Sequence, residues 1–132
     1  MIFGIGTDLI EVKRVGRRLL EADGFKEATF GPREIAYCES QRHKAQNYAA
    51  RFAAKEAFLK AAGVGWQGGL SFAQIEVVPD ERGKPTLALS GAARSFCVEN
   101  AITRIHVSLT HIADLANAVV VLEKDANGVR HG

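Results

Sequence analysis

Cysteine is scarce in this chain, which excludes a scaffold held together by disulfides. The 132 residues contain only Cys38 and Cys97, and these form neither a CxxC motif nor a set of regularly spaced pairs. Both are expected to be free thiols, as is usual in a reducing compartment. We therefore predict a cytoplasmic protein.

Long hydrophobic runs are also missing, and no stretch approaches the ~20 apolar residues that span a bilayer. The N-terminal residues show no basic segment followed by an apolar one, so no signal peptide is expected. No repeat or low-complexity tract is visible. We predict one domain over residues 1–124, followed by a polar, flexible tail over residues 125–132.

Net charge is small, at +2 from 17 basic and 15 acidic side chains. That balance does not indicate a partner such as nucleic acid or membrane. The charges are nevertheless unevenly distributed. Residues 11–18 and 42–60 contain nine basic and two acidic side chains, whereas the rest of the chain is net acidic. The sequence therefore predicts a basic site on an acidic body.

Hydrophobic periodicity changes between helical and strand-like along the chain. The order is strand, three helices, two strands, helix, two strands, without the regular strand–helix–strand units of a doubly wound sheet. We predict an α+β fold, an antiparallel sheet packed with helices. The predicted strands cover residues 1–9, 72–78, 85–89, 104–110 and 115–123, and the helices cover residues 9–22, 33–40, 47–62 and 90–100.

The glycines near the N-terminus resemble the start of a dinucleotide-binding fingerprint. However, Leu9 stands where the third glycine would be, and no suitable helix and strand follow. What remains is a strand that presents Gly4, Gly6 and Asp8 on one side. Asp8 is interpreted either as the N-cap of the next helix or as a ligand for a cation.

The predicted helix over residues 47–62 combines a face of alanines with an apolar stripe and four charged side chains. At ~100° per residue, Arg51 and Lys55 flank the stripe on one side, while Glu56 and Lys60 flank it on the other. A surface helix with a Glu56–Lys60 pair is one interpretation. The other is a buried helix whose charges have partners, because unpaired buried charge is costly.

Asp8 and Glu56 are candidate oxygen ligands for Mg²⁺, which usually takes one or two protein carboxylates and leaves positions for substrate phosphates. Arg51, Lys55 and Lys60 would then neutralise phosphate charge. This set predicts a metal–diphosphate site.

Several polar side chains outside these motifs can be explained by structural roles as well as by functional ones. His106 shares the polar face of its strand with Ser108, and a half-exposed structural histidine is the alternative to a phosphate contact. His111 is expected in a solvated turn, and Lys84 in a hairpin turn. No nucleophile-elbow sequence accompanies Ser108, which excludes that class of hydrolase.

Two motifs resemble the signatures of the 4′-phosphopantetheinyl transferases. These are Ile5-Gly6-Thr7-Asp8 and Arg51-Phe52-Ala53-Ala54-Lys55-Glu56-Ala57-Phe58-Leu59-Lys60. The short chain is similar to the small bacterial branch of that family. The likeness continues through Leu70-Ser71-Phe72, Gly83-Lys84-Pro85 and the segment from His106 to His111.

This resemblance implies transfer of the phosphopantetheine arm of coenzyme A to a serine of apo-acyl carrier protein, with release of 3′,5′-ADP, for fatty acid biosynthesis. It also implies dependence on Mg²⁺ and a homotrimer whose sites lie between subunits. By position, Asp8 and Glu56 match the metal ligands, and Lys55 and Lys60 match lysines near the diphosphate. The other implied roles are coenzyme contacts for Arg51, Lys84 and His106, proton transfer through water for Glu34, and carrier-protein docking for Arg14, Arg17 and Arg18.

Other function classes remain open at this level. The arginines of residues 11–18 would also suit a solvated helix face. A non-catalytic module that binds acyl carrier protein or a nucleotide would also use the basic segments. A nucleic-acid-binding domain would use them too, but the aromatic residues follow core-like periods and form no stacking platform.

Overall fold

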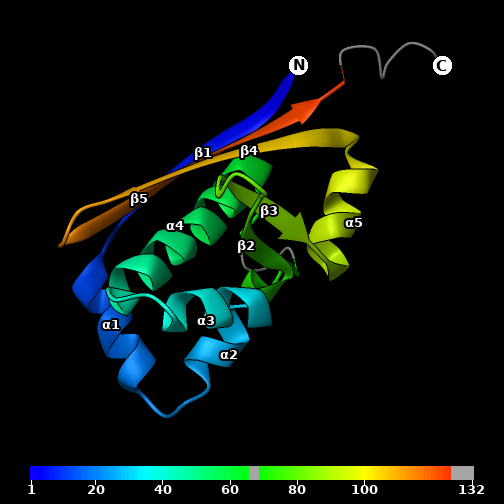
Figure 1. The fold of residues 1–132 in the computed structure, drawn as a ribbon. Coiled ribbons are helices and arrows are strands. Elements are labelled where there is room, and N and C mark those ends of the chain that lie inside the picture. The colour runs from blue at the N-terminus through cyan, green and yellow to red at the C-terminus, as the bar shows by residue number, and fades with distance from the viewer. Residues whose placement is uncertain (66–68, 126–132) are drawn as a thin grey trace.

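One long helix packed against a three-stranded antiparallel sheet organises the fold (Figure 1). The computed structural model describes residues 1–65 and 69–125. In this part of the chain, a three-stranded sheet has the order β1-β5-β4, and a two-stranded sheet pairs β2 with β3. The elements are β1 (Ile2–Glu11), α1 (Val12–Leu20), α2 (Phe25–Thr29), α3 (Pro32–Glu39), α4 (Lys44–Ala62), the 3₁₀ turn η2 (Phe72–Gln74), β2 (Ile75–Pro79), β3 (Pro85–Leu89), α5 (Gly91–Glu99), β4 (Ile102–His111) and β5 (Leu115–Lys124).

The predicted α+β class with antiparallel pairing is confirmed. Helix α4 lies along β1 and β5, while α1, α2 and α3 lie on its other side, as Figure 1 shows. The two cysteines, Cys38 and Cys97, are buried and free, as predicted. Apart from Asp125, the predicted tail lies outside the described residues. Among the described residues, no helix has both the length and the apolar character needed to cross a membrane.

The structure differs from the prediction at several element ends and by one additional helix. Strand β1 continues to Glu11, so Asp8 lies inside a strand opposite Ala118, and its interpretation as a helix N-cap is incorrect. Helix α4 begins at Lys44, and the Asn47 side chain donates to the His43 carbonyl from within the first turn. The five-residue helix α2 was not predicted, because one turn is too short to show a helical period.

Small residues allow β1 and α4 to approach each other closely. Gly6 faces α4, and a Cβ at this position would overlap the carbonyl of Ala57. Ala53, Ala54 and Ala57 are fully buried on the helix. The alternate side chains Ile5 and Leu9 point to the outer face of the sheet and remain about two-thirds exposed (65% and 64%). The glycine side of the strand is therefore the side that packs.

Replacing Gly6 by alanine is expected to lower the free energy of unfolding by about 3 kcal/mol or more. The added Cβ would clash with the backbone carbonyl of Ala57, which cannot move aside as the end of a flexible side chain could. Gly16→Ala in α1 is the matched control. Its Cβ would lie 3.6 Å from the Ala45 Cβ, an ordinary contact, and alanine favours a helix interior by about 0.5–1 kcal/mol. Urea unfolding of both variants measures the contrast, and equal effects would contradict this account of the packing.

Candidate active site

Asp8 and Glu56 come from distant parts of the chain and line one pocket of about 190 Å³. Asp8 reaches it because even-numbered residues of β1 face α4, and Glu56 lies on the side of α4 next to that strand. Arg14 and Arg18 of α1 line the same pocket. We call it the carboxylate pocket. The structure thus brings the two candidate carboxylates together, which their spacing in the sequence left open.

The electrostatics of this pocket suit a divalent cation. Burial raises the pKa of Glu56, and the nearby Asp8 carboxylate raises it further, while Lys60 and Arg14 oppose the shift. Lys60 Nζ lies 3.2 Å from Asp8 Oδ1 and also donates to the Thr7 carbonyl. Two hard oxygen donors that repel each other fit Mg²⁺, which relieves that repulsion.

No set of three or more Asp, Glu, His or Cys side chains in the described part of the chain is grouped to hold a metal ion. Asp8 and Glu56 would therefore supply only part of an octahedral shell. This matches the usual role of Mg²⁺ in phosphoryl transfer, where substrate phosphates and water provide the remaining oxygens.

Lys55 does not face the carboxylate pocket. It has no exposed surface, and its Nζ donates to Glu34 Oε1 at 2.6 Å and to the carbonyls of Phe72 and Ile75. Burial lowers the pKa of Lys55, and the Glu34 carboxylate opposes that shift. The structure thus places this lysine, predicted to lie near the diphosphate, in an internal ion pair.

Glu34 is fully buried as well. Its Oε2 accepts from the Val77 backbone at 2.7 Å, and its Oε1 accepts from the Gly31 backbone at 3.0 Å. Burial raises its pKa, against the influence of Lys55. Glu34 is not among the residues that line the carboxylate pocket, so its proton transfer through water stays a prediction. Its carboxylate joins α3, α4 and β2.

Arg51 lines a second pocket of about 180 Å³, on the other side of α4, together with Asn47, Gly83 and His111. We call it the Arg51 pocket. Arg51 is only 6% exposed, its guanidinium lies over the Tyr37 ring at 4.3 Å, and its Nε has no hydrogen-bond partner among the described residues. A buried donor without a partner calls for an acceptor, and a phosphate oxygen would meet that need.

His106 and His111 occupy different faces of the sheet. His106 is on the outer face, where its Nε2 lies 2.8 Å from Glu123 Oε1. His111 closes β4 on the inner face, beside Arg51. The resemblance assigned His106 to the coenzyme, and His111 was expected in a solvated turn, whereas the structure places His111 at the end of β4 in the Arg51 pocket. The alternation of Val107, Leu109 and His111 along one face would have indicated this place only if the predicted strand had been extended by one residue to His111.

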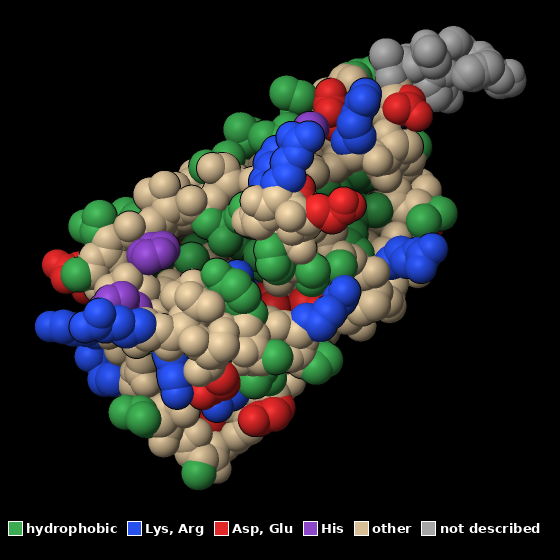
Figure 2. Space-filling model, viewed as in Figure 1, with side chains coloured by type: hydrophobic (Ala, Val, Ile, Leu, Met, Phe, Trp, Pro, Cys, Tyr) green, Lys and Arg blue, Asp and Glu red, His purple; other side chains and the backbone are tan. Residues whose placement is uncertain are grey.

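Lys84 and the arginines of α1 complete the predicted set. Lys84 lies in the β2–β3 turn, where its backbone N–H donates to Asp80 Oδ1 at 2.9 Å, and its neighbours Gly83 and Pro85 line the Arg51 pocket. Arg14 and Arg18 border the carboxylate pocket, whereas Arg17 lines a separate groove. The basic segments thus form surfaces on more than one side of α4, and Figure 2 shows basic side chains gathered near the α1 end of the molecule.

The carboxylate pocket and the Arg51 pocket share no lining residue. This agrees with the predicted division of charges around α4, with Arg51 on one side and Glu56 and Lys60 on the other. The carboxylate pocket contains the candidate metal ligands and two arginines, whereas the Arg51 pocket contains Arg51 and His111. Neither pocket alone has both the carboxylates and the full set of basic side chains that a ligand with several phosphates would need. The structure therefore shows two separate candidate sites in one chain, one lined by two carboxylates and the other by a buried arginine.

An antiparallel α+β fold that gathers two carboxylates in one pocket and a buried arginine in another is suited to a protein that handles phosphate groups. Residues 4–120 match the family model of the 4′-phosphopantetheinyl transferase superfamily. The chain belongs to this superfamily, and it is an enzyme of the phosphopantetheinyl transferase class.

Relatives within that superfamily are the holo-[acyl-carrier-protein] synthases. The chain is 43% identical to the synthase of Geotalea daltonii and 45% identical to that of Geobacter metallireducens, over 94% of its length and 99–100% of theirs. Two solved structures are similar throughout. A Neisseria meningitidis synthase matches with a TM-score of 0.85, 36% identity, and coverage of 94% of this chain and 100% of that one. A Bacillus anthracis synthase in complex with CoA (3′,5′-ADP) matches with a TM-score of 0.78, 37% identity, and coverage of 95% and 99%.

Proposed function

We propose that this protein transfers the 4′-phosphopantetheine arm of coenzyme A to a serine of apo-acyl carrier protein. The products are holo-acyl carrier protein, used in fatty acid biosynthesis, and 3′,5′-ADP. The observation that carries the proposal is the meeting of Asp8 and Glu56 in one pocket bordered by Arg14. The relatives named for this activity, and the solved relative with CoA (3′,5′-ADP), support it.

The reaction is a displacement at phosphorus. The serine oxygen forms a bond to the β-phosphorus of coenzyme A, and the bond from that phosphorus to the oxygen bridging the two phosphates breaks. The serine proton is released, and the α-phosphate leaves as part of 3′,5′-ADP. Such transfers depend mainly on positioning and on neutralising charge.

The chain's own residues would divide this work. Asp8 and Glu56 would hold Mg²⁺, which supplies neutralisation of phosphate charge when bound. Lys60, already within 3.2 Å of Asp8, would hold a diphosphate oxygen. Lys55 and Glu34 would keep α4 in place from inside the core, so we assign them a positioning role in place of direct contact with the reacting groups.

We further propose that a second copy of the chain completes each site. Arg51, His111 and the turn containing Lys84 would bind coenzyme phosphates, but they line a different pocket from Asp8 and Glu56. A homotrimer, as the resemblance implies, would bring the Arg51 pocket of one subunit to the carboxylate pocket of another. The exposed apolar Ile5 and Leu9 on the outer sheet face support burial of that face between subunits.

Intact-mass spectrometry tests the transfer directly. Apo-acyl carrier protein incubated with coenzyme A, Mg²⁺ and this protein is expected to gain the phosphopantetheine mass. A carrier protein with alanine in place of the acceptor serine is the control and should gain nothing. Binding of coenzyme A without any gain in mass would identify a non-catalytic binding module and refute the proposal.

His111→Ala is expected to raise the KM for coenzyme A by about tenfold or more, through loss of a charge-assisted phosphate contact. The matched variant His106→Ala removes a histidine from the outer face of the same strand and should have the smaller effect. Steady-state kinetics with coenzyme A varied separates the two. The reverse order would restore the sequence-based assignment of His106.

Arg14→Glu is expected to raise the KM for carrier protein, because acyl carrier proteins are acidic and Arg14 borders the carboxylate pocket. The KM for coenzyme A should change much less than the KM for carrier protein. Kinetics at several salt concentrations measure the effect, which should shrink as salt screens the charges. An unchanged KM for carrier protein would remove Arg14 from the docking surface.

A further inference from the structure

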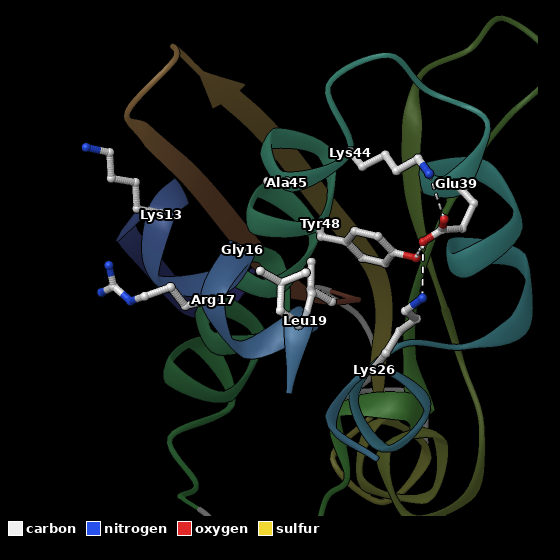
Figure 3. A pocket seen from close by; sticks show the side chains of 10 residues that line it. Lys13, Gly16, Arg17, Leu19, Lys26, Glu39, Lys44, Ala45 and Tyr48 are labelled. Atoms are coloured by element: carbon white, nitrogen blue, oxygen red, sulfur yellow. Dashed lines mark hydrogen bonds and ion pairs between the residues drawn. The ribbon is translucent and has the colours of Figure 1, made fainter. Parts of the chain in front are cut away.

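A groove separate from the carboxylate and Arg51 pockets lies between α1 and the first turns of α4 (Figure 3). Its volume is about 540 Å³, within the range of small-molecule sites. Gly16 and Ala45 keep the floor open, and Leu19 and the Tyr48 ring make it apolar. Leu20, which is 87% exposed, stands at the rim. This exposed apolar surface, formed by the recess and the leucine beside it, is typical of a site that binds an apolar group.

One wall of this groove is a fixed polar cluster. The Tyr48 hydroxyl donates to Glu39 Oε2 at 2.7 Å, and Lys26 and Lys44 pair with the same carboxylate at 3.3 and 3.1 Å. The hydrogen bond from Tyr48, followed by those from Lys44 and Lys26, lowers the pKa of Glu39 to about 2. The carboxylate is therefore ionised near neutral pH, and two lysines outnumber it.

The opposite rim has cations without partners. Lys13 and Arg17 line the groove from α1, and in Figure 3 their charged ends point outward, away from Leu19 and Tyr48. Neither makes a hydrogen bond or ion pair with another described residue, so both side chains are free to turn toward a ligand at the rim. Of the charged residues that line the groove, four are basic and one, Glu39, is acidic. An apolar floor under a cationic rim is complementary to an amphiphilic anion.

We propose that this groove binds a free medium-chain fatty acyl anion, with the acyl chain over Leu19 and Tyr48 and the carboxylate near Lys13 and Arg17. A nucleotide suits the site less well, because the floor offers few polar groups to a base. The Tyr48 hydroxyl is already bound to Glu39. An acyl carboxylate uses both properties of the groove, its apolar depth and its surplus of positive charge.

Isothermal titration calorimetry with decanoate below its micelle concentration tests the proposal. Acetate supplies the charge without the chain, and decanol supplies the chain without the charge. We expect saturable binding of decanoate, and binding at least about tenfold weaker for both analogues. Phosphatidylglycerol vesicles distinguish a membrane source of the same chemistry. Binding to vesicles without binding of free decanoate would overturn the proposal.

Two variants locate the binding. Gly16→Leu fills the floor, and Lys13→Glu reverses a rim charge; each is expected to weaken decanoate binding by about tenfold or more. Arg94→Glu on α5 is the matched charge control, and Gly16→Ala is the control for folding. Thermal unfolding checks that each variant is folded, and Lys13→Glu tests the site even if Gly16→Leu fails to fold. Equal decanoate affinity in all folded variants would refute a site in this groove.

Discussion

Asp8→Asn and Glu56→Gln are each expected to lower kcat by on the order of 100-fold or more, the usual effect of removing one group that stabilises transition-state charge. Each change keeps the shape of the side chain but removes a charged oxygen donor from the carboxylate pocket. Because Asp8 also pairs with Lys60, its loss should additionally release that lysine. The rate of holo-carrier protein formation measures both effects.

Dependence on Mg²⁺ concentration gives these variants a second readout. If Asp8 and Glu56 hold the cation, the remaining activity of either variant should need more Mg²⁺ for half-saturation. Glu11→Gln, at the end of the same strand, is the matched control and should follow the wild type. Wild-type activity at limiting Mg²⁺ in either variant would refute the assignment of that residue as a ligand.

Lys55→Met is expected to lower the free energy of unfolding by about 3–5 kcal/mol, because it leaves the buried Glu34 carboxylate without a partner charge. Adding Glu34→Gln should recover part of the loss, since the uncompensated charge is then removed. Lys44→Met on the same helix is the matched control. Lys44 pairs with Glu39 at an exposed position, so its loss should cost about 0–1 kcal/mol.

Urea unfolding of the wild type, Lys55→Met, the double variant and Lys44→Met measures these differences in the free energy of unfolding. The double variant also separates a positioning role from a direct one. If Lys55 acts through the position of α4, activity should return together with stability in the double variant. A stable Lys55→Met that is inactive would instead show that Lys55 contacts the substrate, as the sequence motif alone implies.

The fold class was predictable from sequence, and Asp8 and Glu56 could be named as candidate ligands, but their meeting in one pocket depends on the packing of β1 against α4. Alternation and helical spacing indicate which faces are buried, and both carboxylates stand on faces next to apolar or small residues. The sequence pattern did not reveal the packing role of the glycines of β1. Gly6 allows the strand to approach α4 closely, which is a property of the contact between two elements.

The roles of Lys55, Glu34 and the histidines depended on tertiary contacts. Lys55 and Glu34 are 21 residues apart and meet only because α3 packs beside α4. No local pattern distinguishes a lysine that faces a phosphate from one that faces a buried carboxylate. The choice between His106 and His111 required the strand's full extent, since β4 runs to His111 and the prediction ended it at residue 110.

The most direct test of the account follows both products of one reaction. Apo-acyl carrier protein, coenzyme A and Mg²⁺ are mixed with the wild-type protein or with Glu56→Gln, and holo-carrier protein and 3′,5′-ADP are quantified over time by mass spectrometry. The account predicts that the wild type forms the two products in equal amounts and that Glu56→Gln forms them on the order of 100-fold more slowly. Formation of neither product by the folded wild-type protein would contradict it.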